Sequence, residues 1–160
     1  MKQGKNYLSG IMQKVIINKK AHHQYQILET WEAGIALKGS EVKSIREGRV
    51  SFVDSFARTK EGEIFLCNLH IAPYPFDNNP HYNPKRERKL LLHKREIERL
   101  IGTLTQKGLT LVPLSIYFKK GKAKLEIALA RGKRLYDKRR KLREKAIEQE
   151  VKRTLKKKLR

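Results

Sequence analysis

NPKRERKLLLHKREIERL, residues 83–100, joins a strongly basic segment to the beginning of a helix. The basic half follows an Asn-Pro pair, which favours a turn or an extended chain, and it holds a single acid, Glu87. Its cations are Lys85, Arg86, Arg88 and Lys89. Such a dense charge is costly to bury, so we expect these side chains to face a partner. The alternative is that they only solvate a loop and a helix entrance.

The other half of this segment shows the apolar spacing of one helix face. Apolar residues recur at i, i+3, i+4 and i+7, and Gly108 follows as a natural stop. They are Ile97, Leu100, Ile101 and Leu104. The pattern predicts a helix over about residues 93–107. A folded body should therefore hold one end of the segment while the basic end faces outward.

The composition favours a polyanionic partner. The 160 residues include 38 Lys and Arg against 16 Asp and Glu, a net charge of +22, and 39% are hydrophobic, which is enough for one modest core. Such an excess of charge repels itself in a compact body, so nucleic acid is the first candidate partner and an anionic membrane the second. No apolar span long enough to cross a bilayer occurs, and the N-terminus lacks the apolar region of a signal peptide. We expect a cytoplasmic protein without a membrane partner.

Alternating apolar residues predict a mainly β domain over residues 14–130, after a flexible leader at 1–13. A short strand at 15–17 precedes a longer one at 25–37, in which Gly34 suggests a bulge or bend. Two hairpins follow, the first at 50–58 and 63–71 around Lys60-Glu61-Gly62, and the second around Lys120-Gly121-Lys122. On the second hairpin we expect two rows, Leu114, Ile116 and Phe118 on one strand and Leu125, Ile127 and Leu129 on the other. The order lacks the alternation of strands and helices typical of a parallel sheet, which favours an antiparallel barrel with helices packed on it.

A short helix is predicted over residues 39–48, with Ser40 as N-cap and Gly48 past its end. Val42 and Ile45 should face inward. Lys43 and Arg46 are three positions apart and share an exposed edge, where they either hold a phosphate or are simply solvated.

The last 30 residues differ from the rest in composition. Residues 131–160 hold 15 Lys or Arg and 4 Asp or Glu, a net of +11, which is half the charge of the chain. Apolar residues recur there at roughly helical spacing but form only a thin stripe. We expect this tail to be disordered alone and to become helical on a polyanion. The alternative is a solubilising tail without a specific target.

The motifs of common enzymes are missing from the sequence. We find no Gly-rich phosphate loop, no paired Cys cluster and no His-Glu helix motif, and the five histidines are scattered. The single cysteine, Cys67, lies in an apolar run and is expected to be a packing residue. We therefore expect a binding protein without catalytic residues, metal or cofactor.

Four segments, in this order and at this spacing, carry a family resemblance. They are NKKAHHQY, WEAGIALKGSEVKSIREGRVSFVDSFA, NPKRERKLLLHKREI and ARGKRLYDKR. Together they closely resemble the SmpB family, the SsrA-binding proteins that partner bacterial transfer-messenger RNA. The match covers residues 14–145, and the final 15 residues are similar only in being basic and helix-prone.

The resemblance implies an oligonucleotide-binding-like β-barrel with two to three flanking helices and no enzymatic activity. Such proteins bind the tRNA-like domain of transfer-messenger RNA and deliver it to stalled ribosomes, where the tail enters the empty messenger channel. Transfer-messenger RNA and the small-subunit decoding centre are thus the expected partners, and the free protein is expected to be a monomer. Two alternatives stay open: a structural ribosomal protein whose tail threads ribosomal RNA, and a metal-dependent RNA-processing enzyme.

The same resemblance assigns roles to residues. It places Glu32, Leu91 and His93 against RNA, together with Asn18 and Lys19 of the first segment; many members have Asn at the position of His93. Lys43, Arg46, Lys85, Arg86, Arg88 and Lys89 would neutralise phosphates. Tail residues assigned to the ribosome are Gly132, Lys133, Arg134, Tyr136, Asp137, Lys138 and Arg139. From the residues alone, Glu32 could equally satisfy a neighbouring Lys, and Leu91 could be a core leucine.

Overall fold

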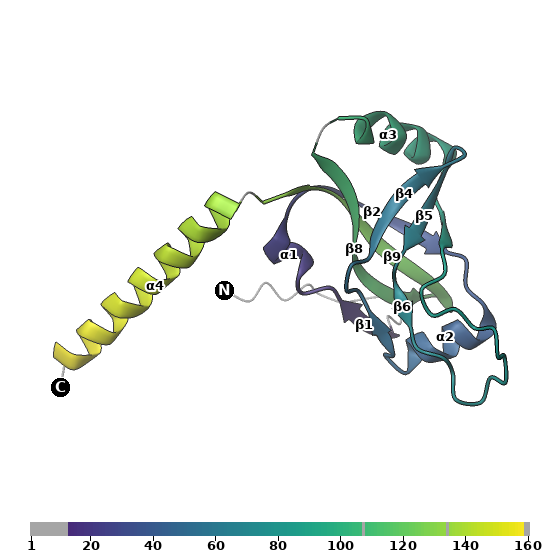
Figure 1. The fold of residues 1–160 in the computed structure, drawn as a ribbon, viewed down its shortest axis with the longest axis horizontal. Helices are drawn as coiled ribbons and strands as arrows, with labels where there is room; N and C mark the ends of the chain where they lie inside the picture. Colours follow the sequence, from purple (N-terminus) through teal and green to yellow (C-terminus); the bar gives the residue numbers. More distant parts are fainter. Residues whose placement is uncertain (1–12, 107, 134, 159–160) are drawn as a thin grey trace.

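The computed structural model describes residues 13–106, 108–133 and 135–158 of the chain (Figure 1). Nine strands and four helices occur within these ranges. In chain order they are β1 Gln13–Ile17, α1 Ala21–Gln24, β2 Tyr25–Ile35, α2 Gly39–Arg46, β3 Val50–Ser51, β4 Phe56–Lys60, β5 Glu63–Cys67, β6 His70–Ile71, β7 Arg88–Leu91, α3 Lys94–Leu104, β8 Leu109–Lys119, β9 Lys122–Gly132 and α4 Leu135–Lys158. The leader expected at residues 1–13 lies almost wholly outside the described residues.

Six strands form a closed antiparallel ring. Their order is β8-β4-β5-β7-β2-β9, and β9 pairs with β8 to close it. β1 pairs with residues 115–118 of β8, beyond the point where β4 pairs with Leu111. Closure leaves no unpaired strand edge in the ring. The prediction of a mainly β, antiparallel barrel with flanking helices is confirmed.

The core of the barrel comes from the inward-facing residues of these strands. Leu66, Ile116 and Leu125 are completely buried, and burying one such side chain contributes about 1.5–3 kcal/mol. The expected row on β8 is wrong in one respect. A bulge between Pro113 and Ser115 reverses the alternation, so Leu114 packs in a second cluster with Ala128 and Ala130 while Ile116 and Phe118 face the main core.

β2 is a single strand of 11 residues, and its irregularity is not at Gly34. The register with β9 shifts between Ile27 and Glu29, which leaves Leu28 47% exposed. Gly34 serves a different need, because it pairs with Leu91 of β7, and a Cβ on Gly34 would lie 3.1 Å from the Cβ of Leu91. The glycine therefore permits close packing of two strands rather than a bend.

Both predicted hairpins are present, with changes in extent. The β8–β9 turn places Lys120 and Gly121 at φ 51° and 74°, the left-handed pair that suits a two-residue hairpin. The first hairpin is divided: β4 pairs with β5, and the separate strands β3 and β6 pair beyond them. The left-handed residues Asp54 (φ 59°) and Asn68 (φ 58°) lie between the two parts, where the chain turns.

The helices begin at positions that differ slightly from those expected. α2 has Lys38, not Ser40, as its N-cap, because the Glu41 carboxylate accepts the Lys38 N–H at 2.8 Å and helical geometry starts at Gly39. Ile45 is buried and Val42 partly so, as predicted. α3 begins after His93 and packs against the core through Leu100, which is fully buried.

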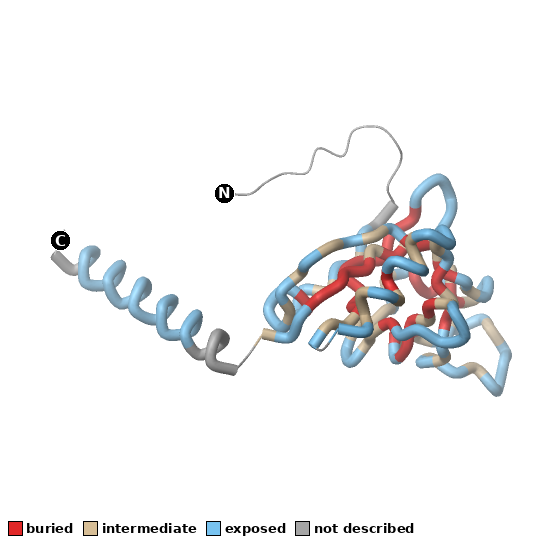
Figure 2. Tube along the Cα trace, turned by 90° about the horizontal axis from the view of Figure 1, so that it is seen from above, coloured by how far each residue is buried: buried red, intermediate tan, exposed pale blue. Residues whose placement is uncertain are grey.

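α4 stands apart from the barrel (Figures 1 and 2). Every residue from 140 to 156 is exposed, including Leu142, Ile147 and Val151. β9 continues to Gly132, so the barrel extends two residues beyond the expected boundary at 130. No helix in the described ranges has the length and apolar character needed to cross a membrane.

Candidate nucleic-acid interface

The basic segment that precedes β7 contains an internal ion cluster. Arg88 is fully buried, and its Nε and Nη2 donate to Glu41 Oε1 at 3.0 and 2.8 Å. Arg86 Nη2 reaches the second oxygen, Oε2, at 2.6 Å. Arg88 also donates to the carbonyls of Leu69 and Pro84 at 2.7 and 2.9 Å. The expectation that all four cations face RNA is wrong for Arg88, and Arg86 is largely engaged, because Glu41 compensates their charge inside the fold.

Glu41 is ionised within this cluster. Burial alone would raise its pKa, but the hydrogen bonds from Arg86, the Lys38 N–H and Arg88 outweigh burial and hold the pKa below its usual range. A fully buried carboxylate with two guanidinium partners is the arrangement in which an internal charge is tolerated. Glu41 therefore links α2 to the loop before β7 and to β7 itself.

The other predicted phosphate contacts are on the surface. Lys85 is exposed, and Lys89, which pairs with Glu63 at 3.2 Å, keeps 43% of its side chain exposed. Lys43 and Arg46 do not converge on one point, because each lies over a different ring. The Lys43 ammonium is 5.1 Å from the centre of Tyr74, and the Arg46 guanidinium is 5.2 Å from that of Phe118.

Glu32, Leu91 and His93 are brought together in one groove, which we call the Glu32 groove. It has a volume of about 650 Å³ and lies where β2, α2, β7, the first turn of α3 and the start of β9 meet. Its lining comprises Glu32, Gly34, Ile35, Leu37, Val42, Leu91, Leu92, His93, Glu96, Lys122, Ala123 and Lys124. Leu91 is 54% exposed, so it is not a core leucine. A lining that combines apolar, acidic and basic residues suits a flat heterocycle attached to an anionic backbone.

Two side chains of β8 hold the carboxylate of Glu32. The Tyr117 hydroxyl donates to Oε2, and Lys119 Nζ lies 3.3 Å from both oxygens. The hydrogen bond from Tyr117 is the largest contribution that lowers the pKa of Glu32. Tyr117 is only 8% exposed, and burial together with Glu32 raises its pKa, so it stays protonated and keeps donating. Glu32 thus pairs with a neighbouring lysine, Lys119, as the alternative to an RNA contact requires. Its side chain is nevertheless 37% exposed, so it remains on the surface.

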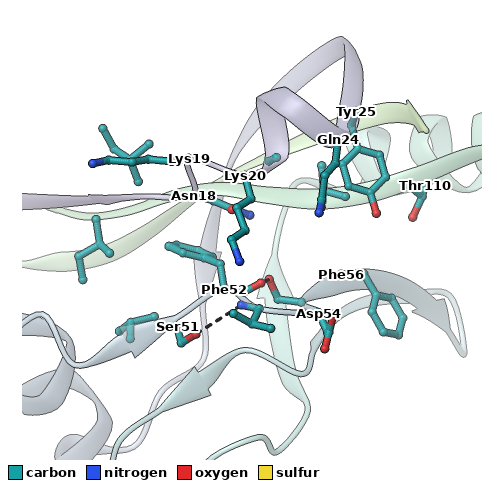
Figure 3. Close-up of a pocket in the computed structure, with 17 residues that line it drawn as sticks. Asn18, Lys19, Lys20, Gln24, Tyr25, Ser51, Phe52, Asp54, Phe56 and Thr110 are labelled. Atoms are coloured by element: carbon teal, nitrogen blue, oxygen red, sulfur yellow. Dashed lines mark hydrogen bonds between the residues drawn. The ribbon is translucent and has the colours of Figure 1, made fainter. Parts of the chain in front are cut away.

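Asn18 and Lys19 lie on a different groove, which we call the β1 groove. It has a volume of about 620 Å³ and lies between the end of β1 with α1 and the loop that links β3 to β4. Figure 3 shows Lys20 pointing across it toward the segment with Ser51 and Asp54. Asn18 has a structural contact as well, because its side-chain amide donates to the Pro113 carbonyl at 2.8 Å.

The predicted tail residues are only partly described. Gly132 ends β9, and Lys133 is tied to α1, with its N–H donating to the Gln24 carbonyl at 3.0 Å and its Nζ to the His22 carbonyl at 2.7 Å. Arg134 lies outside the described residues. The same is true of the side chains of Tyr136, Asp137, Lys138 and Arg139, whose backbone forms the first turns of α4.

Several groove residues escaped the sequence analysis. Tyr117 and Lys119 alternate on β8 with buried apolar residues, so the sequence indicates that they point away from the core. Their contact with Glu32 depends on the order of the strands, which the sequence does not show. Lys122 and Lys124 were assigned only to a hairpin turn and strand. Lys20 could have been suspected from its neighbour Lys19. Among the described residues, no group of three or more His, Cys, Asp or Glu side chains is placed to hold a metal ion.

Comparison with known proteins identifies the family. The family model described as SmpB protein matches residues 15–157. The chain belongs to the SmpB family. The four segments that suggested this family all lie within or overlap the matched range.

Curated members of the SmpB family resemble the chain over most of its length. The SsrA-binding protein of Carboxydothermus hydrogenoformans is 56% identical over 145 residues, which cover 90% of this chain and 97% of the relative. That of Aquifex aeolicus is 57% identical over 143 residues, or 89% of this chain and 91% of the relative. A solved chain, described as "tmRNA-SmpB: a journey to the center of the bacterial ribosome", is 58% identical with a TM-score of 0.65; the match covers 76% of this chain and 85% of that one.

Proposed function

We propose that this protein binds the tRNA-like domain of transfer-messenger RNA and delivers it to stalled ribosomes for trans-translation. Support comes from SmpB membership, from relatives named SsrA-binding proteins and from the similar chain described with tmRNA and the bacterial ribosome. The observation that carries the proposal is the Glu32 groove, which brings Glu32 of β2 together with Leu91 and His93, which lie about sixty residues later at the end of β7 and the start of α3.

Within the groove each group has a distinct task. The ionised Glu32 accepts a hydrogen bond from a base or sugar, and its fixed orientation selects among donors. Leu91 gives an apolar surface for a base or ribose, and His93 at the start of α3 offers a further polar contact. Lys122 and Lys124 attract the nearby phosphates, as do Lys85, Lys89, Lys43 and Arg46 elsewhere on the surface. Asn18 and Lys19 belong to a second RNA contact along the β1 groove.

The tail acts on the ribosome rather than on transfer-messenger RNA. Residues from Gly132 onward lead into α4, whose cations can follow ribosomal RNA along the empty messenger channel. Tyr136 stacks on an exposed base in the decoding centre, and Lys133, Arg134, Lys138 and Arg139 contact phosphates beside it, with Asp137 among them. The protein acts as a cytoplasmic adaptor and catalyses no reaction.

Binding to a transcript of the tRNA-like domain tests the proposal. The competitor is an unrelated hairpin of equal length, and both RNAs are measured across a salt series. We expect the tRNA-like RNA to bind more than tenfold tighter and to keep this lead as salt rises, because contacts other than phosphate neutralisation distinguish it. Equal affinities that fall together with salt would contradict the proposal and favour a ribosomal protein held by charge alone.

A substitution locates the specificity. Glu32→Gln should weaken binding of the tRNA-like RNA by about tenfold, within the range of about 1–3 kcal/mol for one base contact, and leave the slope against salt unchanged. Glu29→Gln is the matched control, since Glu29 lies on the same strand but pairs with Arg99 at 2.8 Å and does not line the groove. If both variants lose affinity alike, Glu32 makes no specific contact.

A further inference from the structure

The loop between β6 and β7, residues 72–87, is held rigidly at its base. The Tyr82 hydroxyl donates to the Ile71 carbonyl at 2.7 Å, and the Ile71 N–H donates to the Pro84 carbonyl at 3.1 Å. Buried Arg88 binds the same Pro84 carbonyl. The loop also contains four prolines, each with a restricted backbone. Its conformation is therefore largely fixed before any partner binds.

The tip of this loop presents aromatic side chains to solvent. Phe76 is 81% exposed, more than any other large apolar residue for which burial is described. Its ring meets that of Tyr74 edge to face, with centres 5.5 Å apart and planes at 62°. A single exposed apolar residue is ordinary on a protein surface. Here, however, the exposed ring of Phe76 contacts a second ring, Tyr74. Both residues belong to the loop between β6 and β7, whose backbone Figure 1 shows near α2 at the lower right.

Two cations lie on the Tyr74 side of this pair of rings. The Lys43 ammonium of α2 lies 5.1 Å from the centre of the Tyr74 ring, and Arg49 Nη1 donates to the Pro73 carbonyl at 3.2 Å. Both side chains are on the surface. Asp77 is the one acid of the tip, and its N–H donates to the Tyr74 carbonyl. An exposed ring next to two cations matches the two parts of a nucleotide, since bases stack on aromatic faces and phosphates pair with Lys and Arg.

We propose that Phe76 and Tyr74, with Lys43 and Arg49, form a stacking platform for an unpaired base of an RNA strand. Phe76 contacts the face of the base, Tyr74 fixes the orientation of Phe76, and the two cations neutralise the adjoining phosphates. Neither ring lines the Glu32 groove or the β1 groove, so the platform is a separate site. The platform goes beyond the proposed function, because it would bind an unpaired base of any RNA strand and not only the tRNA-like domain.

The test uses the full chain and two synthetic strands, a six-nucleotide oligoadenylate and an abasic oligoribonucleotide of the same length. Ring resonances of Phe76 and Tyr74 are followed by NMR during titration. We expect saturable upfield shifts of both rings with oligoadenylate only, because the abasic strand offers charge without a base to stack. The basic tail binds both strands through their phosphates, so the ring signals separate the platform from the tail.

Substitutions distinguish stacking from apolar contact. Phe76→Ala and Phe76→Leu should each lower oligoadenylate affinity at this site about tenfold, the usual loss for one stacked base, whereas Phe76→Trp should retain it. Leu28→Ala, at an exposed apolar residue of β2, is the matched control and should bind normally. Lys43→Gln should lower the slope of log affinity against log salt by about 1, which Phe76→Ala should not do.

Two outcomes would overturn the platform. One is ring shifts of equal size with the abasic strand, and the other is normal binding by Phe76→Leu, which would indicate an apolar surface for a protein partner. Glu32→Gln should leave the ring shifts unchanged. Failure of the platform therefore leaves the Glu32 groove and the proposed function untouched.

Discussion

At the scale of single residues, Glu32 is an acid on a basic surface that two neighbouring side chains hold in place. Tyr117 and Lys119 keep its carboxylate ionised and fix the direction of its oxygens. A free surface glutamate would lose side-chain entropy on meeting RNA, whereas a carboxylate already oriented by its neighbours loses less. Tyr117 is thus a positioning residue that acts through Glu32.

Replacing Tyr117 by Phe tests this role. The variant keeps the ring but loses the hydroxyl, so the pKa of Glu32 should rise toward its usual range, as measured by carboxyl NMR titration. Because the pKa of Glu32 is lowered in the native protein, its carboxylate should stay charged to lower pH there. As the pH is lowered, Tyr117→Phe should therefore lose RNA affinity at a higher pH than the native protein does. Tyr82→Phe loses a hydroxyl that donates to the Ile71 carbonyl and not to Glu32, so it should not move the profile. An unchanged pKa of Glu32 in Tyr117→Phe would contradict the role.

The sequence indicates which residues carry chemistry, but it does not show where a partner distant in the chain holds them. Glu32, Leu91 and His93 could be named from the sequence, by resemblance, and the structure places them in one groove. Arg88 was expected on the surface, because its charge is evident but its partner Glu41 lies 47 positions away. Nothing in the local sequence indicates that this one acid is aimed at two arginines.

At the scale of elements, the ion cluster of Glu41 is what holds α2 against β7. Glu41→Gln should lower the free energy of unfolding by about 3–5 kcal/mol, because it leaves the buried Arg88 without its charge partner. Thermal or chemical unfolding measures the loss. Glu47→Gln is the control, since Glu47 pairs with Arg49 on the surface at 3.5 Å, and such pairs contribute about 0–1 kcal/mol.

The contribution of this cluster to the free energy of unfolding depends on pH, and the direction of the dependence follows from the pKa of Glu41. The pKa of Glu41 is lowered in the folded state, so its contribution to stability is present above the usual glutamate range and is lost as the pH falls through the lowered value. Glu41→Gln lacks this contribution at every pH. The stability difference between the two proteins should therefore narrow in acid, and a constant difference would show that Glu41 stabilises by packing alone.

The helicity of α4 in the absence of a partner is a property that an experiment can test. The structure contains the helix, and the disorder expected for the isolated tail stays a prediction. A peptide of residues 135–158 should show little helix by circular dichroism in water and gain helix when RNA is added, since charge repulsion outweighs pairs such as Arg140–Glu144. A scrambled peptide without the apolar stripe should gain less. High helicity in water alone would contradict the expectation.

Periodicity located most elements and missed their ends. Alternation located both hairpins and helical spacing located α3, because each element has one face against the core. It could not locate the bulges at Leu28 and Leu114, which shift the register to suit neighbouring strands, nor the N-cap at Lys38, which depends on a side chain three residues later. These details follow from tertiary contacts rather than from local preference.

At the scale of the whole molecule, a closed barrel with its grooves is joined to a separate basic helix through Lys133. Ending the chain after Lys133 should leave binding of the tRNA-like RNA nearly unchanged, because no described residue of α4 lines either groove, but should abolish tagging of stalled peptides in a translation assay. A tail of equal length and charge with a scrambled sequence is the control and should restore little tagging. Equal loss of RNA binding and tagging would contradict the separation of tasks.

Closure of the barrel also sets when the chain can fold. β9 lies near the end of the chain, yet it pairs with both β2 and β8, and the β2–β9 partners are about a hundred residues apart in the chain. Contacts so distant in sequence make folding slow, in the range of milliseconds to seconds, and they delay the completed ring until β9 has been synthesised. A product that stops before residue 122 leaves β2 and β8 each with an unpaired edge, which invites aggregation. The fold therefore depends on translation that continues through β9.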